Sequence, residues 1–109
     1  IRYAEILLMH AEALTQGAAS SAMSSIQAVN EVRARAGLSA LASVTLDDVL
    51  AEKFAEFGME WGVRFYDLVR HNQTEELNKP GATYTPAARF LVYPQPQMDI
   101  LPQLRQPSN

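Results

Sequence analysis

The most chemically versatile side chains of this 109-residue chain are concentrated in residues 54–70. Aromatic rings alternate there with acidic and basic groups, and residues 60–70 read EWGVRFYDLVR. Glutamate four residues before arginine, and arginine three residues before aspartate, are spacings at which helical side chains meet. We therefore expect Glu60, Arg64 and Asp67 to form one partly buried ionic network.

Two kinds of chemistry fit this network. In the first, Glu56, Glu60 or Asp67 would provide the acid and base of a glycosidase beside an aromatic sugar platform. In the second, arginine neutralises carboxylates that join two helices, and the rings belong to the core. The second interpretation is favoured, because a nearby arginine lowers a carboxyl pKa and so works against a general acid near neutral pH. It predicts that Arg64→Ala strands both carboxylates and destabilises the fold.

The other reactive residue types form no catalytic or metal-binding pattern. His10 and His71 lack the HxxxH or HExxH spacing of a metal site, and the chain has no cysteine for a thiolate ligand, a nucleophile or a disulfide. The serines at 20–25 lie at an expected helix start, where serine is a common cap, and no GxSxG motif surrounds them. The sequence therefore predicts no catalytic residue, no metal ligand and no cofactor.

Length and composition are those of one ordinary globular domain, with 48% hydrophobic and 19% charged residues. Nine basic against twelve acidic residues give a net charge of −3, so the chain lacks the positive surface that a nucleic-acid-binding protein presents. No apolar run approaches the roughly 18 residues of a membrane span. Because the chain opens at Ile1 with no initiator methionine, we expect it to be a piece of a longer protein.

Proline placement divides the chain into two parts. All six prolines lie in residues 80–109, which predicts a helical part over 1–79 and a Pro-rich extended arm over 80–109. Within the arm, residues 89–93 favour a short strand or extended segment. Pro94 and Pro96 follow directly, so such a strand could lie only at the edge of a sheet. The expected fold is mainly α, with tetratricopeptide-like helical hairpins followed by this arm, in a single domain or fragment.

The first hairpin is expected from helical periodicity. One helix is predicted over residues 2–16, with Gly17 after its last turn, and a second from Ser20 or Ser21 through about residue 35. Together they span about one tetratricopeptide-length repeat. The second helix presents an apolar face expected to meet the first, formed by Met23, Ile26, Val29, Val32 and Ala36.

A third helix has the clearest start. Thr45 with Asp48 three residues later fits a capping box, in which the threonine hydroxyl accepts from the aspartate backbone N–H. A break is expected at residues 61–63, before a short helix over 64–71. The predicted buried stripe of the third helix comprises Leu46, Val49, Leu50, Phe54, Phe57 and Trp61.

Five segments resemble one family in its own order. They are IRYAEILLMHAEAL at 1–14, NEVRARAGL at 30–38, EKFAEF at 52–57, RFYDLVR at 64–70 and YPQPQMDILPQLRQ at 93–106. These segments resemble the conserved blocks of the SusD/RagB family, the surface nutrient-binding lipoproteins of Bacteroidetes. The chain departs from the family pattern at Trp61, which stands between Glu60 and glycine, and at Gln106, which is not followed by asparagine. These departures bear on the subfamily more than on the family.

The resemblance implies the C-terminal portion of a larger SusD-like protein. It implies a non-enzymatic, lipid-anchored protein on the outer-membrane surface that binds oligosaccharides or peptides and delivers them to a TonB-dependent SusC-like transporter. The family's ligand-binding residues lie mainly upstream of this portion, so none is assigned to a position here. The resemblance gives a structural role to the signature residues Glu56, Glu60, Arg64, Asp67 and Arg70.

Two other functions stay open from the sequence. The chain could be a free-standing helical-repeat module that binds a protein partner through a concave face. It could also be a glycoside hydrolase fragment that uses Glu56, Glu60 or Asp67, which would require turnover that disappears when one carboxylate is replaced.

Overall fold

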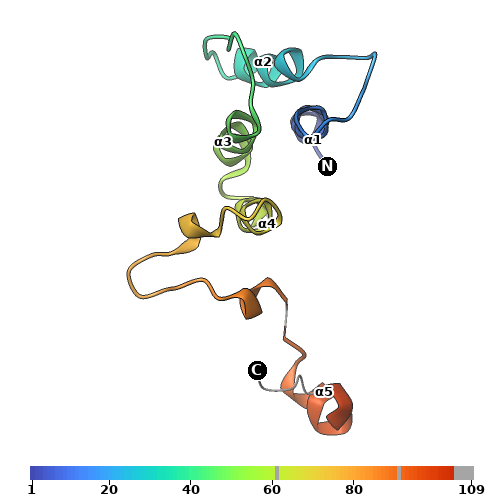
Figure 1. Cartoon of the computed structure of the whole chain (residues 1–109), viewed down its shortest axis with the longest axis vertical. Helices are drawn as coiled ribbons and strands as arrows, with labels where there is room; N and C mark the ends of the chain where they lie inside the picture. Colours follow the sequence, from blue (N-terminus) through green and yellow to red (C-terminus); the bar gives the residue numbers. More distant parts are fainter. Residues whose placement is uncertain (61, 91, 105–109) are drawn as a thin grey trace. The chain divides into compact units, whose positions relative to one another are not determined.

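The structure is a computed structural model, and it is mainly helical, as the sequence predicted (Figure 1). It describes residues 1–60, 62–90 and 92–104. The chain forms two compact units, which we call unit 1 (Ile1–Gln73) and unit 2 (Thr74–Asn109). None of the helices in the described ranges combines the length and apolar composition needed to cross a membrane.

The described residues of unit 1 form four α-helices. They are α1 (Tyr3–Thr15), α2 (Ser25–Arg35), α3 (Leu46–Phe57) and α4 (Val63–Arg70). Helix α1 packs against both α2 and α3, and α3 also packs against α4 (Figure 1). Helix α1 is therefore covered on more than one side.

The hairpin of α1 and α2 forms as predicted, but its second helix starts later. Gly17 follows α1 with a φ of +94°, a left-handed conformation that favours glycine. Ser24, rather than Ser20 or Ser21, caps α2: its hydroxyl accepts from the backbone N–H of Gln27, whose side chain accepts in return from the Ser24 N–H. The earlier serines lack a glutamine or glutamate at the third helical position, so a full capping box is possible only at Ser24.

Helix α3 begins at the predicted capping box. The Thr45 hydroxyl accepts from the backbone N–H of Asp48 at 3.3 Å, and the Asp48 carboxylate accepts from the Thr45 N–H at 2.8 Å. The helix ends at Phe57, and Gly62 adopts a φ of +67° before α4 begins. A break and a short fourth helix are present as predicted, but α3 ends at Phe57, earlier than the predicted break at 61–63, and α4 already includes Val63.

The core of unit 1 lies between α1, α2 and α3. Three residues expected in it are exposed: Ala36, Ile26 by 37% and Phe54 by 52%. On α2, Ala28 is fully buried instead. The small side chain of Ala28 allows α2 to approach α1 closely, which turns the bulkier Ile26 toward the edge. The buried cluster comprises Leu7, Leu8, Ala11, Ala28, Val29, Val32, Val49 and Phe57. Trp61, also expected in the stripe, lies outside the described residues.

Unit 2 consists of short helical turns rather than an extended arm. It contains the 3-10 helices η1 (Thr74–Leu77), η2 (Pro86–Arg89) and η3 (Pro102–Leu104), and the α-helix α5 (Gln95–Ile100). A short strand or extended segment was expected over 89–93. Arg89 instead ends η2, whereas Phe90 has an extended backbone; Leu91 lies outside the described residues. Proline fixes a φ that suits the first turn of a helix, and Pro86, Pro96 and Pro102 all stand there.

Candidate functional site

A buried amine lies at the junction of α1, α3 and α4. Lys53 of α3, whose side chain is 6% exposed, places its Nζ 3.0 Å from Glu12 Oε2 and 2.8 Å from Asp67 Oδ2. The two carboxylates come from α1 and α4 and are equally buried. Because an isolated charge is costly to bury, the three side chains stabilise one another only while all are present. The cluster joins three helices.

Two further side chains, Arg70 and His71, contact the Glu12 carboxylate. Arg70 donates to Glu12 Oε1 and also to Asp67 Oδ1, the latter at 2.6 Å, and His71 Nε2 lies 2.7 Å from Glu12 Oε1. Burial by itself would raise the pKa of Glu12, but the hydrogen bonds from Arg70, His71 and Lys53 outweigh it and lower the pKa to about 2. Glu12 is therefore a carboxylate throughout the physiological pH range. We call Glu12, Lys53, Asp67, Arg70 and His71 the charge cluster.

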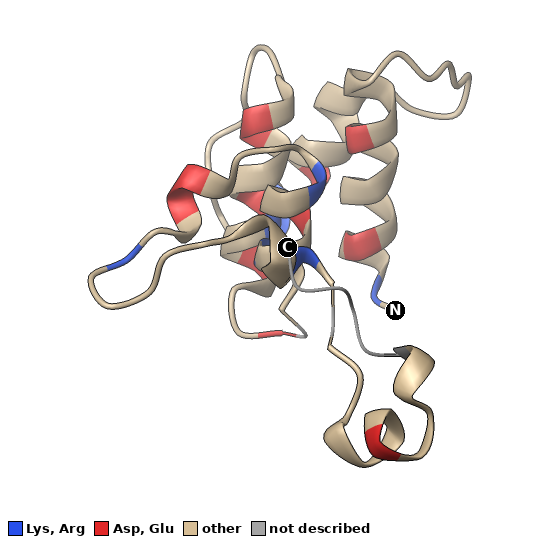
Figure 2. Cartoon of the chain, turned by 60° about the horizontal axis from the view of Figure 1, so that its bottom comes forward, with Lys and Arg blue, Asp and Glu red and all other residues tan. Residues whose placement is uncertain are grey.

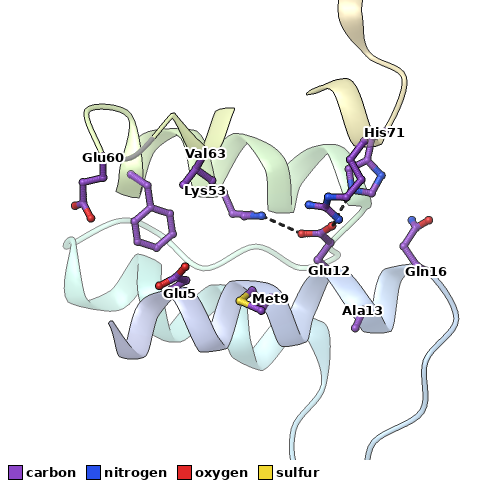
Figure 3. Close-up of a pocket in the computed structure, with 11 residues that line it drawn as sticks. Glu5, Met9, Glu12, Ala13, Gln16, Lys53, Glu60, Val63 and His71 are labelled. Carbon is purple, nitrogen blue, oxygen red and sulfur yellow. Dashed lines mark hydrogen bonds and ion pairs between the residues drawn. The ribbon is translucent and has the colours of Figure 1, made fainter. Parts of the chain in front are cut away.

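A groove of about 490 Å³ runs beside the charge cluster, within unit 1. Figure 3 shows Glu12 and His71 toward one end of it and Glu5 and Glu60 toward the other, with Met9 between them. Figure 2 marks in red the acidic positions along α1, the helix next to the N-terminus. The volume of the groove is in the range of small-molecule sites. The groove is lined by Glu5, Met9, Glu12, Ala13, Gln16, Lys53, Phe57, Glu60, Val63, Arg70 and His71.

The predicted network of Glu60, Arg64 and Asp67 is wrong. Glu60 instead accepts from Arg2 at 2.8 Å, and Asp67 pairs with cations of the charge cluster. Arg64 reaches back to α3, where its guanidinium donates to the Leu50 carbonyl at 3.5 Å and stacks 5.1 Å from the centre of the Phe54 ring. The turn at Gly62 separates Glu60 from α4, so the spacing rule for one continuous helix does not apply to Glu60 and Arg64. Arg64 and Asp67 share α4, but Asp67 is paired with Lys53 and Arg70 while Arg64 turns toward α3.

Glu56 lies in a second ionic group, near the start of the chain. Its carboxylate pairs with Arg2 at 2.9 Å and Arg35 at 2.5 Å, and it is 7% exposed although both arginines are largely exposed. Arg2 also stacks 4.8 Å from the centre of the Phe57 ring. Of the signature residues, Asp67 and Arg70 thus belong to the charge cluster, Glu56 and Glu60 to the group around Arg2, and Arg64 to the contact with α3.

The two histidines contact different parts of unit 1. His10 Nε2 lies 3.0 Å from the Met23 carbonyl oxygen, whereas His71 belongs to the charge cluster. Among the residues that the structure describes, no group of three or more His, Asp or Glu side chains has the arrangement of a metal site.

Sequence reasoning missed three members of the charge cluster, namely Glu12, Lys53 and His71. Lys53 interrupts the apolar stripe of α3, and Glu12 is next to the buried Ala11. A charged residue on the buried face of a helix was the available signal, because such a residue is rarely buried unless it is paired. The sequence offered no way to match these partners, which lie 41 and 59 positions apart.

Four carboxylates of the charge cluster and of the group around Arg2 are paired with cations. Glu12, Glu56, Glu60 and Asp67 each accept from at least one cationic side chain. For Glu12 this pairing lowers the pKa to about 2, whereas a general acid must hold a proton near neutral pH. The geometry is that of helix-joining ion pairs.

The chain belongs to the SusD family. The model of that family matches residues 1–90, which carry the hairpin, the charge cluster and the groove. This match confirms the family expected from the five sequence segments.

A curated relative agrees with this assignment. A SusD-like protein of Bacteroides ovatus is 39% identical over 70 residues, which are 63% of this chain. The matched part is 13% of that protein's length, so the chain corresponds to a small portion of it. No solved structure matches the chain.

Proposed function

We propose that the protein to which this chain belongs is a non-enzymatic nutrient-binding protein of the bacterial outer-membrane surface. It binds oligosaccharides or other nutrients and delivers them to a TonB-dependent SusC-like transporter. It is held at the membrane by a lipid on an upstream cysteine. The observation that carries the proposal is the SusD family match over residues 1–90.

In this proposal the 109 residues serve as a helical scaffold. The charge cluster supports that role, because its ion pairs fix the relative positions of α1, α3 and α4. If the helices shifted, a buried ion pair would separate and leave uncompensated charges. Such pairs therefore favour one arrangement of the helices over others. The signature residues Glu56, Glu60, Arg64, Asp67 and Arg70 then act in positioning helices rather than in contacting nutrient.

The pairing of the carboxylates argues against a glycoside hydrolase. Hydrolysis of a glycoside needs one protonated carboxyl group, and each candidate accepts from arginine or lysine instead. A helical-repeat interaction module is the second candidate, favoured by the packing of α1 against both α2 and α3. It differs from the first in predicting an unlipidated protein.

Mass spectrometry of the parent protein from the source cell's membrane fraction tests the proposal. We expect an upstream cysteine carrying a covalent lipid, and co-purification of a TonB-dependent transporter after mild detergent extraction. An unlipidated, soluble protein of about this length would contradict the proposal and favour the interaction module.

Binding and turnover are tested on the same purified parent protein. We expect it to retain at least one oligosaccharide or peptide from the growth medium and to release that ligand chemically unchanged. Hydrolysis that disappears in Glu56→Gln, Glu60→Gln or Asp67→Asn would overturn the non-enzymatic assignment.

A further inference from the structure

Helix α4 ends in a left-handed turn at a residue that is not glycine. Asn72 has a φ of +56°, and no other non-glycine residue in the described ranges has a positive φ. The backbone N–H of Gln73 donates to the Leu68 carbonyl at 2.8 Å, and that of Asn72 donates to the Val69 carbonyl at 3.3 Å. These two hydrogen bonds define a Schellman motif, in which the left-handed residue is usually glycine.

Glycine takes this role at the ends of α1 and α2. Gly17 and Gly37 have φ values of +94° and +73°. The N–H groups that follow them, on Ala18 and Leu38, donate back into their own helices at 3.0 and 2.9 Å. A residue with a Cβ is less stable in the left-handed region than glycine, although asparagine tolerates it better than most. The turn at Asn72 therefore needs support from contacts on either side of it.

The residues before and after Asn72 provide those contacts, and they reach two different helices. His71 Nε2 lies 2.7 Å from Glu12 Oε1 on α1. Gln73 Nε2 donates to Asp47 Oδ1 at 2.7 Å, in the first turn of α3. Because the Glu12 carboxylate can only accept, Nε2 is the nitrogen of His71 that carries the hydrogen.

We propose that residues 71–73 form a clasp that locks the end of α4 onto α1 and α3, with Asn72 as its positioning residue. The φ of Asn72 sets the direction of the chain between the two contacts. A right-handed or extended backbone at this position moves His71 and Gln73 relative to each other, so both partners cannot be reached at once. His71 and Glu12 also line the groove, so the clasp fixes the shape of that end of it.

The hydrogen on the His71 ring reports whether the clasp is closed. Long-range ¹H–¹⁵N NMR spectra of the 109-residue chain at pH 8 distinguish a ring protonated at Nε2 from one protonated at Nδ1. We expect the Nε2–H form for His71 in the parent and in Asn72→Gly, which keeps the left-handed turn without strain. In Asn72→Val we expect a mixture of the two forms, because a β-branched residue disfavours a positive φ.

His10 is the control within the same spectra. Its Nε2 lies 3.0 Å from the Met23 carbonyl oxygen, which also accepts only, so it should show the Nε2–H form in every variant. Circular dichroism verifies that each variant is folded. A change at His10 together with His71 would indicate a general loss of structure and would count against the clasp.

Stability measurements separate the clasp from strain in the turn alone. In urea denaturation Asn72→Val should lower the folding equilibrium constant about tenfold, whereas Asn72→Gly should change it little. If the clasp couples the turn to His71, the same Asn72→Val change should cost about threefold at most when His71→Ala is already present. Strain that does not depend on the clasp would cost the same in both backgrounds.

Two results would overturn the inference. One is a His71 ring that remains wholly in the Nε2–H form in a folded Asn72→Val variant. The other is an equal loss of stability from Asn72→Val with and without His71. Neither result bears on lipidation or on the transporter, so the proposed function would stand in both cases.

Discussion

The amine of Lys53 lies 3.0 Å from the carboxylate of Glu12, although 41 positions separate the two residues along the chain. Both side chains are less than 10% exposed, and Asp67 lies on the other side of the amine. One lysine therefore holds helices α1, α3 and α4 together. Loss of this contact should therefore destabilise unit 1.

Replacement of Lys53 by methionine should destabilise the chain by about 3 kcal/mol. Methionine is of similar length, so the main loss is the charge that compensates Glu12 and Asp67. Urea denaturation followed by circular dichroism measures the change. Lys79→Met is the matched control, because Lys79 is exposed in unit 2 and should change the midpoint little. Equal midpoints for the two variants would show that the charge cluster contributes nothing to stability.

Acid should weaken the fold through Glu12. Its pKa is about 2 in the folded chain against an ordinary value of 4.5, so its contribution is complete above pH 4.5 and is lost as the pH falls toward 2. The loss should reach up to about 3 kcal/mol. Denaturation midpoints measured from neutral pH to about pH 3 follow it.

The Glu12→Gln variant isolates this pH dependence. It should be less stable than the parent at neutral pH, but its stability should fall less steeply on acidification, because the titrating group has been removed. Glu75→Gln should retain the parent slope. If Glu12→Gln followed the parent slope as well, another carboxyl group would be responsible.

Truncation of Leu8 to alanine should cost about 3 kcal/mol, since Leu8 is fully buried in the core between the helices. Ile6 is on the same helix and is 49% exposed, so Ile6→Ala should cost well under half as much. Thermal denaturation of the two variants compares them directly. Similar melting temperatures would mean that α1 is packed differently from the arrangement in Figure 1.

Loss of the α3 cap should destabilise unit 1 by about 1 kcal/mol. In Thr45→Ala the backbone N–H of Asp48 loses the hydroxyl that accepts from it. Thr85→Ala provides the control, since Thr85 precedes η2 without a side-chain cap hydrogen bond. We expect a lower urea midpoint for the first variant only; a matching decrease in the second would indicate a general effect of threonine removal.

Local sequence signals predicted most of unit 1. The capping box at Thr45, the glycine after α1 and the break before α4 depend on contacts between residues close together in sequence, so they could be recognised without a fold. The same signals were ambiguous where several residues of one type compete, as with the serines before α2. In unit 2, proline predicted the absence of long helices but not the short helical turns that it starts.

The sequence by itself determined the family, the helices and the concentration of charge near α4. The tertiary structure decided which charges meet: Glu60 with Arg2, Asp67 with Lys53, and Glu12 with Lys53, Arg70 and His71. Spacing rules apply only while one helix continues, and the turn at Gly62 ends that condition. The packing of the helices determines which ion pairs form between separate helices. Helices α1 and α3 pack through their apolar faces, and this packing brings the buried Glu12 and Lys53 into contact.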